Sequence, residues 1–247
     1  MKRQNKKAIV VGATSGLGYE TALQLLSQGW TIGVAGRREE RLKQLQEKAP
    51  ERIHIKAIDI CTPQAAAQLQ ELIDEMGGID LYMHCSGIGY QNHALLPEIE
   101  LNTLETNGTG FTRMITAAFN YFATSQRSGQ IAIISSIAGT KGLGVAPAYS
   151  ATKRFQNTYI DALEQLAHMK HLDIKFTDIR PGFVATELLN GGKGYPMLMT
   201  PEYAGKIIAN AVVQQKRVKI VDWKYRLLVF FWKLIPAAIW RHLKVKN

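Results

Sequence analysis

The sequence has few cysteines and few prolines. Its two cysteines, Cys61 and Cys85, are too few for a disulfide framework and lack the clustered spacing of a zinc site. This scarcity favours a reducing, cytoplasmic compartment. With 8 prolines, 46% hydrophobic and 20% charged residues, the composition excludes a disordered, collagenous or coiled-coil chain. A length of 247 residues predicts one globular domain, residues 1–247.

We also expect that the N-terminal residues do not form a secretory signal. Four bases lie among the first seven residues, but the apolar run behind them spans only residues 8–11. The apolar region of a signal peptide needs roughly 7 to 15 residues. We therefore expect this run to form the first strand of the fold.

Acidic residues are scarce at both ends of the chain. The formal net charge is +10, yet the first seven residues carry four bases, and residues 216–247 carry nine bases with Asp222 as their one acid. The body, residues 8–215, is therefore near −2. Because the positive charge is confined to the ends, the sequence disfavours nucleic-acid binding. It indicates instead that the basic C-terminal segment binds a partner with an anionic surface.

Short β-branched segments alternate with helical patterns along the chain. The segments that predict strands are residues 7–11, 31–35, 53–58, 81–85, 131–135, 174–179 and 218–221. The patterns that predict helices are residues 17–28, 38–48, 63–76, 104–123, 148–170 and 201–215. Strict alternation predicts a single-domain α/β fold, a doubly wound, Rossmann-like parallel sheet of about seven strands with helices on both faces. Irregular stretches at 87–102 and 181–200 follow strand ends, where such sheets bind ligands.

A glycine-rich turn follows the first predicted strand and opens into a helix. Its glycines, Gly12, Gly16 and Gly18, permit a tight turn and allow backbone N–H groups to approach a pyrophosphate. An ordinary strand-to-helix turn is the alternative reading of such a short motif.

The end of the second predicted strand carries Arg37 and Arg38. NAD-specific sites place an acidic residue here for the ribose 2′-OH, whereas arginine accommodates a 2′-phosphate, so we expect NADP(H). The alternative is that both arginines begin a solvated helix and pair with Glu39 and Glu40. Asp59, at the end of the third strand, could hold the adenine end of the cofactor or cap its own loop.

Tyr149 and Lys153 lie four residues apart at the start of a predicted helix, so their side chains project from one face. A phenol has an unperturbed pKa near 10, and a neighbouring ammonium group favours its ionised form. Ser136 ends the fifth strand, where its hydroxyl would face the cleft beside Tyr149. Asn107 precedes another helix, and its spacing alone favours a helix cap.

Together these residues resemble the short-chain dehydrogenase/reductase family over residues 7–215. The matching pieces are VGATSGLG, Asp59, Asn107, Ser136, the YSATK stretch with Tyr149 and Lys153, and RPGFVAT at 180–186. The resemblance implies hydride transfer between a nicotinamide and a carbonyl or alcohol. It implies that Tyr149 protonates the carbonyl oxygen and Ser136 hydrogen-bonds it. Lys153 would bind the nicotinamide ribose and lower the pKa of Tyr149, and Asn107 would position a water that relays protons.

The resemblance also implies a set of cofactor contacts and a homodimer or homotetramer. The cofactor-binding residues would be Gly12, Ser15, Gly16, Leu17, Gly18, Arg37, Arg38, Asp59, Ile60, Gly87, Tyr149, Lys153, Pro181, Gly182, Val184 and Thr186. The family's usual Asn-Asn-Ala-Gly is replaced here by His84, Cys85, Ser86 and Gly87. We interpret His84 and Cys85 as structural residues, and hydrogen bonds at the sheet centre must then come from elsewhere.

The C-terminal tail of the domain, residues 223–247, is apolar and basic. Residues 227–240 contain a single charge, on Lys233, with bases on both sides. A membrane-spanning helix needs about 20 apolar residues, and Pro236 interrupts this run, so we expect no span. A helix in an anionic membrane interface typically carries basic flanks and aromatic side chains, here Trp223, Tyr225, Trp232 and Trp240. The alternative is packing across the substrate cleft or a subunit interface, and the sequence leaves both open.

These features predict an NADPH-dependent reductase that acts on a ketone or aldehyde of an apolar, lipid-like substrate. Apolar residues of the second irregular stretch support this substrate class, namely Leu188, Leu189, Met197, Leu198 and Met199. The alternative is an NADP(H)-binding sensor or membrane-associated scaffold with little catalysis, which has no need of the acid/base pair. A nucleotide-sugar epimerase is disfavoured because no second substrate domain follows the sheet.

Overall fold

The computed structural model describes residues 6–189 and 194–245. Part of the expected basic N-terminus, including Lys2 and Arg3, lies outside the described residues. So do positions 190–193 of the second irregular stretch and the last two residues of the tail.

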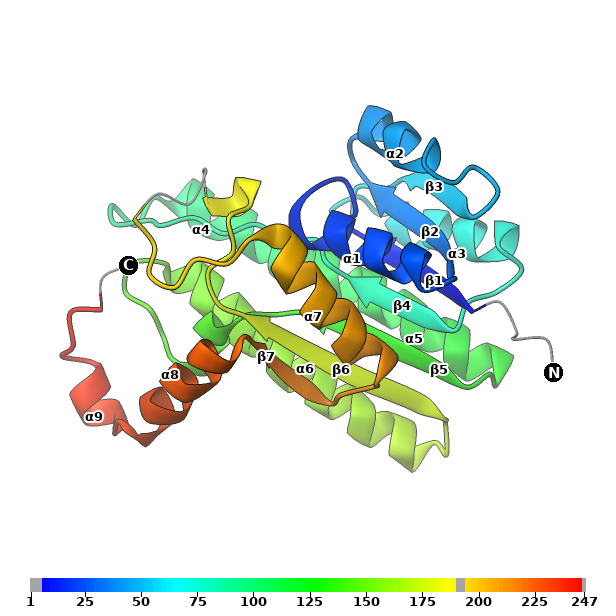
Figure 1. Cartoon of the computed structure of the whole chain (residues 1–247). Coiled ribbons are helices and arrows are strands. Elements are labelled where there is room, and N and C mark those ends of the chain that lie inside the picture. The colour runs from blue at the N-terminus through cyan, green and yellow to red at the C-terminus, as the bar shows by residue number, and fades with distance from the viewer. Residues whose placement is uncertain (1–5, 190–193, 246–247) are drawn as a thin grey trace.

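Seven parallel strands form one sheet in the order β3-β2-β1-β4-β5-β6-β7 (Figure 1). The strands are β1 (Lys7–Val11), β2 (Thr31–Gly36), β3 (Ile53–Ala57), β4 (Leu81–His84), β5 (Gly129–Ile134), β6 (Ile174–Pro181) and β7 (Val218–Val221). Most of their residues are buried on both faces, as apolar parallel strands require. The predicted doubly wound α/β sheet is confirmed.

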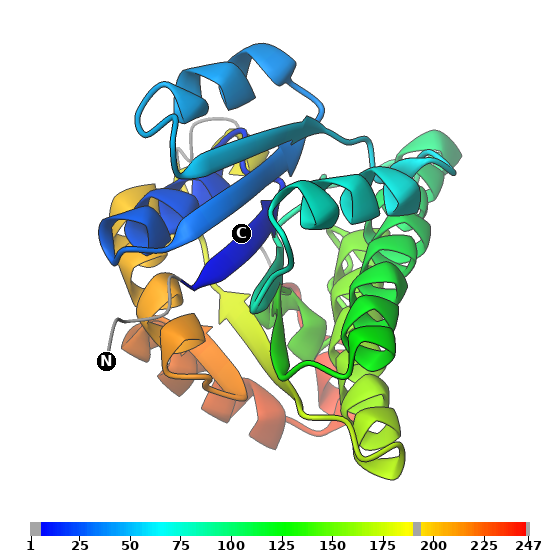
Figure 2. The ribbon, with the colours of Figure 1, turned by 90° about the vertical axis from the view of Figure 1, so that its right-hand side faces the viewer.

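Helices cover both faces of the sheet (Figure 2). One core cluster joins the sheet to α1 (Gly16–Ser27), α2 (Glu39–Gln46), α7 (Pro201–Val213) and α8 (Trp223–Leu234). A second cluster joins the opposite face to α3 (Ala65–Glu75), α5 (Phe111–Ser125) and α6 (Pro147–Met169). The carboxyl ends of the strands therefore open between two helical layers.

The first expected irregular stretch contains a helix. α4 (Pro97–Leu104) begins with a proline in its first turn and continues through the π-helical segment η1 (Glu105–Gly110) into α5. The helix predicted to begin at 104 thus begins seven residues earlier. Thr103 is the one buried residue of α4, so this helix has no buried apolar face.

The tail forms α8 followed by the single turn α9 (Ala237–Trp240). Asp222 caps α8 by accepting a hydrogen bond from the backbone N–H of Lys224 at 3.0 Å. Pro236 precedes α9 and separates the two helices. Within residues 6–189 and 194–245, no helix combines the length and apolarity needed to cross a bilayer.

Candidate active site

The glycine turn between β1 and α1 has no room for side chains. Gly12 has φ +90°, and a Cβ there would lie 2.5 Å from the backbone nitrogen of Ser86. A Cβ on Gly18 would lie 2.2 Å from the carbonyl oxygen of Gly12. Ser15 precedes the helix without a side-chain cap, and the first turn of α1 holds no acid. This uncapped N-terminus fits the pyrophosphate of a dinucleotide, because backbone N–H groups and the helix dipole both favour an anion.

Arg38 lies directly beside this turn. Its guanidinium donates hydrogen bonds to the Thr14 hydroxyl at 2.9 and 3.1 Å and to the Ser15 hydroxyl at 2.6 Å. The predicted alternative partner Glu39 instead binds Lys43, at 2.8 Å. Arg37 is exposed at the same corner. The cationic group that the sequence placed near the ribose is therefore in contact with the glycine turn.

Two cationic residues near Arg38 were not predicted from the sequence. Arg41 and Lys48 of the α2 region line a groove of about 370 Å³ together with Thr14 and Ser15. Arg41 lies one helical turn beyond Arg38, a spacing that could have placed both on one helix face. The groove is basic and adjoins the glycine turn, so it can accept a phosphate.

Glu187 joins this basic corner to the loop after β6. Its carboxylate accepts from Arg38 at 2.7 Å and from Arg41 at 2.5 Å. Hydrogen bonds from the two arginines hold the pKa of Glu187 well below its usual range. Glu187 thus occupies the same guanidinium donors that a ribose phosphate would need.

Asp59 caps its own loop with one carboxylate oxygen, which accepts from the Cys61 backbone N–H at 3.0 Å. The neighbouring Ile60 is buried, and its carbonyl accepts from Arg113 at 2.6 Å. The sequence left two roles open for Asp59, a contact with the adenine end of the cofactor and a loop cap. The structure shows the loop cap.

Ser136 and Tyr149 meet at the carboxyl end of β5. Ser136 is buried, and its hydroxyl accepts from the Ala138 backbone N–H at 3.1 Å. Tyr149 begins α6, and the loop after β4 closes over its ring, since a Cβ on Gly89 would lie 2.7 Å from a Tyr149 ring carbon. Desolvation raises the pKa of Tyr149, while a hydrogen bond with Ser136 lowers it by a smaller amount.

The direction of this Tyr149 pKa shift corrects the sequence-based expectation. Lys153 was expected to lower it, yet the Lys153 ammonium lies 5.7 Å from the centre of the Tyr149 ring and donates elsewhere. It binds the Ile134 carbonyl at 3.0 Å and the Gln156 side chain at 3.1 Å. Desolvation lowers the pKa of Lys153 itself to about 8, against the opposing effects of Asp178 and Cys85. Burial therefore outweighs the effect of Ser136 on the pKa of Tyr149 and the effect of the neighbouring charges on the pKa of Lys153.

Asn107 is not a helix cap, contrary to what its spacing suggested. It lies inside the π-helical segment η1, buried, where its side chain bonds both backbone groups of Ile88, accepting at 2.9 Å and donating at 2.7 Å. Its main-chain carbonyl accepts from Gln156 at 2.9 Å. A π-turn leaves one backbone carbonyl without its usual hydrogen bond inside the helix. Here that carbonyl accepts a hydrogen bond from the Gln156 side chain.

Gln156 is a site residue that the sequence argument missed. It is buried and bridges Lys153 to the Asn107 carbonyl. Its one signal in the sequence is position, three residues after Lys153 on the same helix face.

The expected cofactor-binding segment after β6 lies beside these groups. The Pro181 carbonyl lies 3.5 Å from the Ser136 hydroxyl, and Val184 bridges to Met199. Thr186 approaches the turn, since a Cβ on Gly16 would lie 3.1 Å from its methyl group. Gly182 packs against the ring of Tyr225 from the tail helix.

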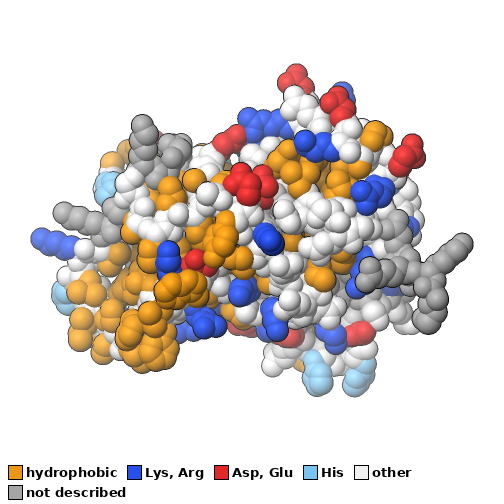
Figure 3. All heavy atoms as spheres, in the orientation of Figure 1, with side chains coloured by type: hydrophobic (Ala, Val, Ile, Leu, Met, Phe, Trp, Pro, Cys, Tyr) orange, Lys and Arg blue, Asp and Glu red, His pale blue; other side chains and the backbone are white. Residues whose placement is uncertain are grey.

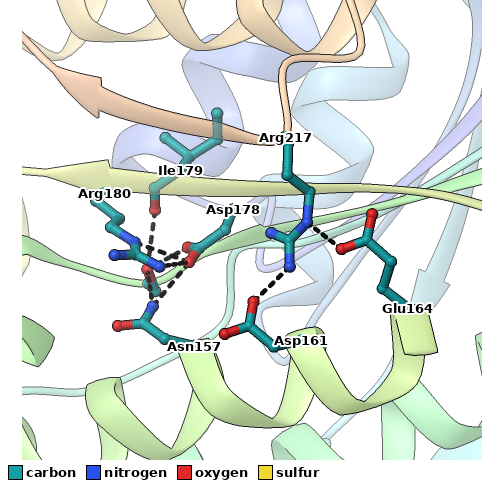
Figure 4. Close-up of polar contacts among 8 residues, drawn as sticks. Asn157, Asp161, Glu164, Asp178, Ile179, Arg180 and Arg217 are labelled. Atoms are coloured by element: carbon teal, nitrogen blue, oxygen red, sulfur yellow. Dashed lines mark hydrogen bonds and ion pairs between the residues drawn. The ribbon is translucent and has the colours of Figure 1, made fainter. Parts of the chain in front are cut away.

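A buried polar network anchors this end of β6 to α6 (Figure 4). The Asp178 carboxylate accepts from Asn157 at 2.9 Å, from Arg180 at 2.6 and 2.8 Å, and from Ser135. Ser135 directly precedes Ser136 in the chain, and Asn157 lies four residues after Lys153. Both side chains donate to the Asp178 carboxylate. These contacts supply side-chain hydrogen bonds between β5, β6 and α6.

A second group in Figure 4 joins Arg217, before β7, to two acids of α6, Asp161 and Glu164. These ion pairs lie nearer the surface than the Asp178 network.

His84 and Cys85 contribute to packing. The His84 ring lies within hydrogen-bonding distance of the Tyr82 hydroxyl, at 2.9 Å, and makes an edge contact with Phe111. Burial lowers the pKa of His84 to about 3 and raises the pKa of the Cys85 thiol. Both groups are therefore uncharged at neutral pH, in keeping with a structural role.

Comparison with known protein families matches residues 6–193 to the short chain dehydrogenase model. An uncharacterized oxidoreductase of Myxococcus xanthus is 30% identical over 242 residues, covering 95% of this chain and 94% of its own. Dehydrogenase/reductase SDR family member 7B of Xenopus laevis is 29% identical over 237 residues, covering 86% of this chain and 72% of its own.

Solved structures share the fold at lower identity. A 3-ketoacyl-(acyl-carrier-protein) reductase from Brucella melitensis, complexed with NADH, superposes with a TM-score of 0.78 at 20% identity, covering 89% of this chain and 97% of its own. An alcohol dehydrogenase from the archaeon Thermococcus sibiricus, complexed with 5-hydroxy-NADP, gives a TM-score of 0.74 at 20% identity, covering 88% and 95%.

Proposed function

The chain belongs to the short-chain dehydrogenase family, and on this basis we propose that it is an NADP(H)-dependent oxidoreductase that reduces the ketone or aldehyde of an apolar substrate. The observation that carries the proposal is the clustering of Ser136, Tyr149 and Lys153: the Ser136 side chain lies close enough to the phenol to lower its pKa, and the Lys153 ammonium lies 5.7 Å from the centre of the Tyr149 ring. Three groups able to bind or protonate a carbonyl oxygen thus converge at the carboxyl end of β5.

A bound nicotinamide dinucleotide would supply the hydride. Tyr149 then gives its phenolic proton to the carbonyl oxygen, and the Ser136 hydroxyl donates a hydrogen bond to that oxygen. Because desolvation raises the pKa of Tyr149, the phenol keeps its proton at neutral pH, which is the state that reduction requires. Lys153, held by Ile134 and Gln156, keeps a positive charge close to the phenol as that proton leaves.

Preference for NADP(H) is supported by the basic corner at the glycine turn. Arg38 already donates to Thr14 and Ser15, and Arg41 lines the adjoining groove. Guanidinium groups bind phosphate through charge-assisted, bidentate hydrogen bonds. Of the two superposed structures named above, one holds an NADP derivative and the other NADH, so the proposed preference rests on this chain's own arginines.

An apolar substrate is supported by the loops around the site. Large hydrophobic side chains stay exposed on the two loops that follow β4 and β6, namely Leu95, Leu96, Leu188, Met197 and Leu198. Such exposed apolar side chains beside a reactive group are typical of a site for a hydrophobic ligand.

We also propose a homodimer or homotetramer and a cytoplasmic location. The exposed side chains of Leu101, Leu104 and Phe155 offer an apolar face on α4 and α6 for subunit contact.

The test is a comparison of wild-type protein with Tyr149→Phe. NADPH oxidation is followed with a panel of medium-chain aldehydes and ketones, and cofactor affinity is measured by fluorescence titration. We expect NADPH to bind at least about tenfold more tightly than NADH. Tyr149→Phe should retain NADPH binding and lose turnover, because a phenyl ring cannot donate the proton. Turnover by Tyr149→Phe would remove the acid/base role, and a wild-type protein that binds NADPH without turnover would be a sensor.

A further inference from the structure

The tail helix α8 has two apolar faces, and only one of them packs on the protein. Tyr225 and Val229 are buried in the core, with Trp232 packed beside them. On the opposite side an outer apolar face is exposed by 52% to 65% per residue, formed by Trp223, Leu227, Phe230, Phe231 and Leu234. Their spacing of four, seven, eight and eleven residues from Trp223 puts all five on one helical stripe.

Exposed apolar side chains continue beyond α8 onto α9, and hydrogen bonds tie this part of the tail to the loop at residues 141–142. These exposed side chains are Ile239 and Leu243, past Pro236. Lys141 donates to the Ile235 carbonyl at 2.8 Å, and the Trp240 indole donates to the Gly142 carbonyl at 2.8 Å. Figure 3 shows hydrophobic side chains gathered at the lower left, in the region of α8 and α9. The patch is thus an ordered surface whose apolar side chains are already exposed.

The rim of the patch is basic throughout. The exposed bases on or beside α8 and α9 are Lys224, Arg226, Lys233, Arg241 and Lys244. Residues 223–245 contain no acid, and the nearest one, Asp222, is buried as the cap of α8. An occupant of this surface must therefore combine apolar groups with negative charge.

From this combination we infer that α8 and α9 dock in the plane of an anionic lipid bilayer. The outer apolar face enters the boundary between headgroups and acyl chains, and the basic rim meets the lipid phosphates. A second copy on a two-fold axis fits worse, because an isologous contact would bring the basic rims of both copies together. The helix lies on the membrane, since Pro236 divides the apolar run and α8 has only 12 residues.

The docking helix also contacts the active-site loops. The Tyr225 hydroxyl donates to the carbonyls of Pro196 at 2.9 Å and Met197 at 3.1 Å, and its ring packs on Gly182. The helix that carries the docking surface is therefore tied, through its inner face, to the loop that carries exposed Met197 and Leu198. The docking surface itself does not depend on the proposed catalytic activity, and its test needs no turnover.

The experiment is flotation of the full-length protein with vesicles of phosphatidylcholine alone or of phosphatidylcholine and phosphatidylglycerol in equal parts. We expect binding to the mixed vesicles that weakens as salt increases. Phe230→Gln combined with Phe231→Gln should lower the partition coefficient by at least roughly tenfold, through lost apolar burial. Arg226→Gln combined with Lys233→Gln should lower it roughly fivefold per base. Met169→Gln, at the C-terminal end of α6 and 69% exposed, is the matched control and should float like wild type.

Circular dichroism melting confirms that each variant is folded before flotation. Absence of wild-type binding to the mixed vesicles would overturn the inference, as would equal binding to both vesicle types at all salt concentrations. If the wild type does not float and the double phenylalanine variant converts a dimer into a monomer in solution, a second copy covers the patch and the inference is wrong.

Discussion

The ring of Tyr225 packs directly on Gly182: a Cβ added to this glycine would lie 2.3 Å from three of the ring carbons. Gly182 belongs to the segment expected to contact the cofactor, whereas Tyr225 belongs to the tail helix. The tail therefore packs directly on a segment expected to line the candidate active site. The sequence left two roles open for the tail. The face with Tyr225 packs beside the loops of the candidate active site, and the opposite face is exposed and available to bind an external surface.

Gly182→Ala should destabilise the protein by about 1 to 3 kcal/mol, because the added methyl group overpacks against a buried ring. The free energy of unfolding in urea measures the effect. Gly144→Ala is the control, since a Cβ there meets nothing within 4 Å. Equal stability of the two variants would mean that α8 moves aside freely and does not form a fixed wall.

Glu187→Gln should raise the affinity for NADPH, by about fivefold, and leave NADH binding nearly unchanged. The reason is competition: Glu187 holds Arg38 and Arg41, the groups proposed for the 2′-phosphate. Isothermal titration with both cofactors measures the change. Glu39→Gln, which frees only Lys43, is the matched control. Weaker NADPH binding by Glu187→Gln would instead make Glu187 a residue that positions the arginines.

The stability difference between wild type and Lys153→Met should change with pH. Folding lowers the pKa of Lys153 to about 8 from its ordinary value of 10.5, so the unfolded chain binds more protons between these values. The penalty for burying the charged amine is complete below pH 8 and is relieved as pH rises, so wild type should gain stability relative to the variant. Urea unfolding at about pH 7 and pH 9.5 checks the sign. A constant difference would mean that Lys153 titrates alike in both states.

Much of this site was predictable from local sequence. The strand ends located Ser136 and the glycine turn, and the four-residue spacing placed Tyr149 and Lys153 on one helix face. These features depend on backbone periodicity, which a sequence shows directly. The raised pKa of Tyr149 was not predictable, because desolvation depends on segments distant in the chain, such as the loop at Gly89.

The same limit explains the contacts that the sequence did not reveal. Glu187 lies 149 residues from Arg38, and Tyr225 lies 43 residues from Gly182. Such contacts are set by the arrangement of the strand-end loops, and no short motif encodes them. Asn107 was misread for a related reason: the helix begins at Pro97, so Asn107 lies inside it and not at its start.

Gln156→Leu should reduce turnover more than it weakens substrate binding. The change leaves the Asn107 carbonyl and the Lys153 ammonium each without one partner, and we expect a loss of stability of about 1 to 3 kcal/mol. Because Lys153 loses an oxygen ligand that stabilises its charged form, the pH profile of kcat should shift to lower pH, and Gln156→Glu should shift it to higher pH.

Gln165→Leu, at an exposed position on the same helix, is the control for leucine in α6. Steady-state kinetics across pH separates positioning from simple support of the fold, because a purely structural Gln156 would lower the amount of active protein and leave the midpoint of the profile where it is. An unmoved midpoint in both variants would therefore contradict the role assigned to the bridge.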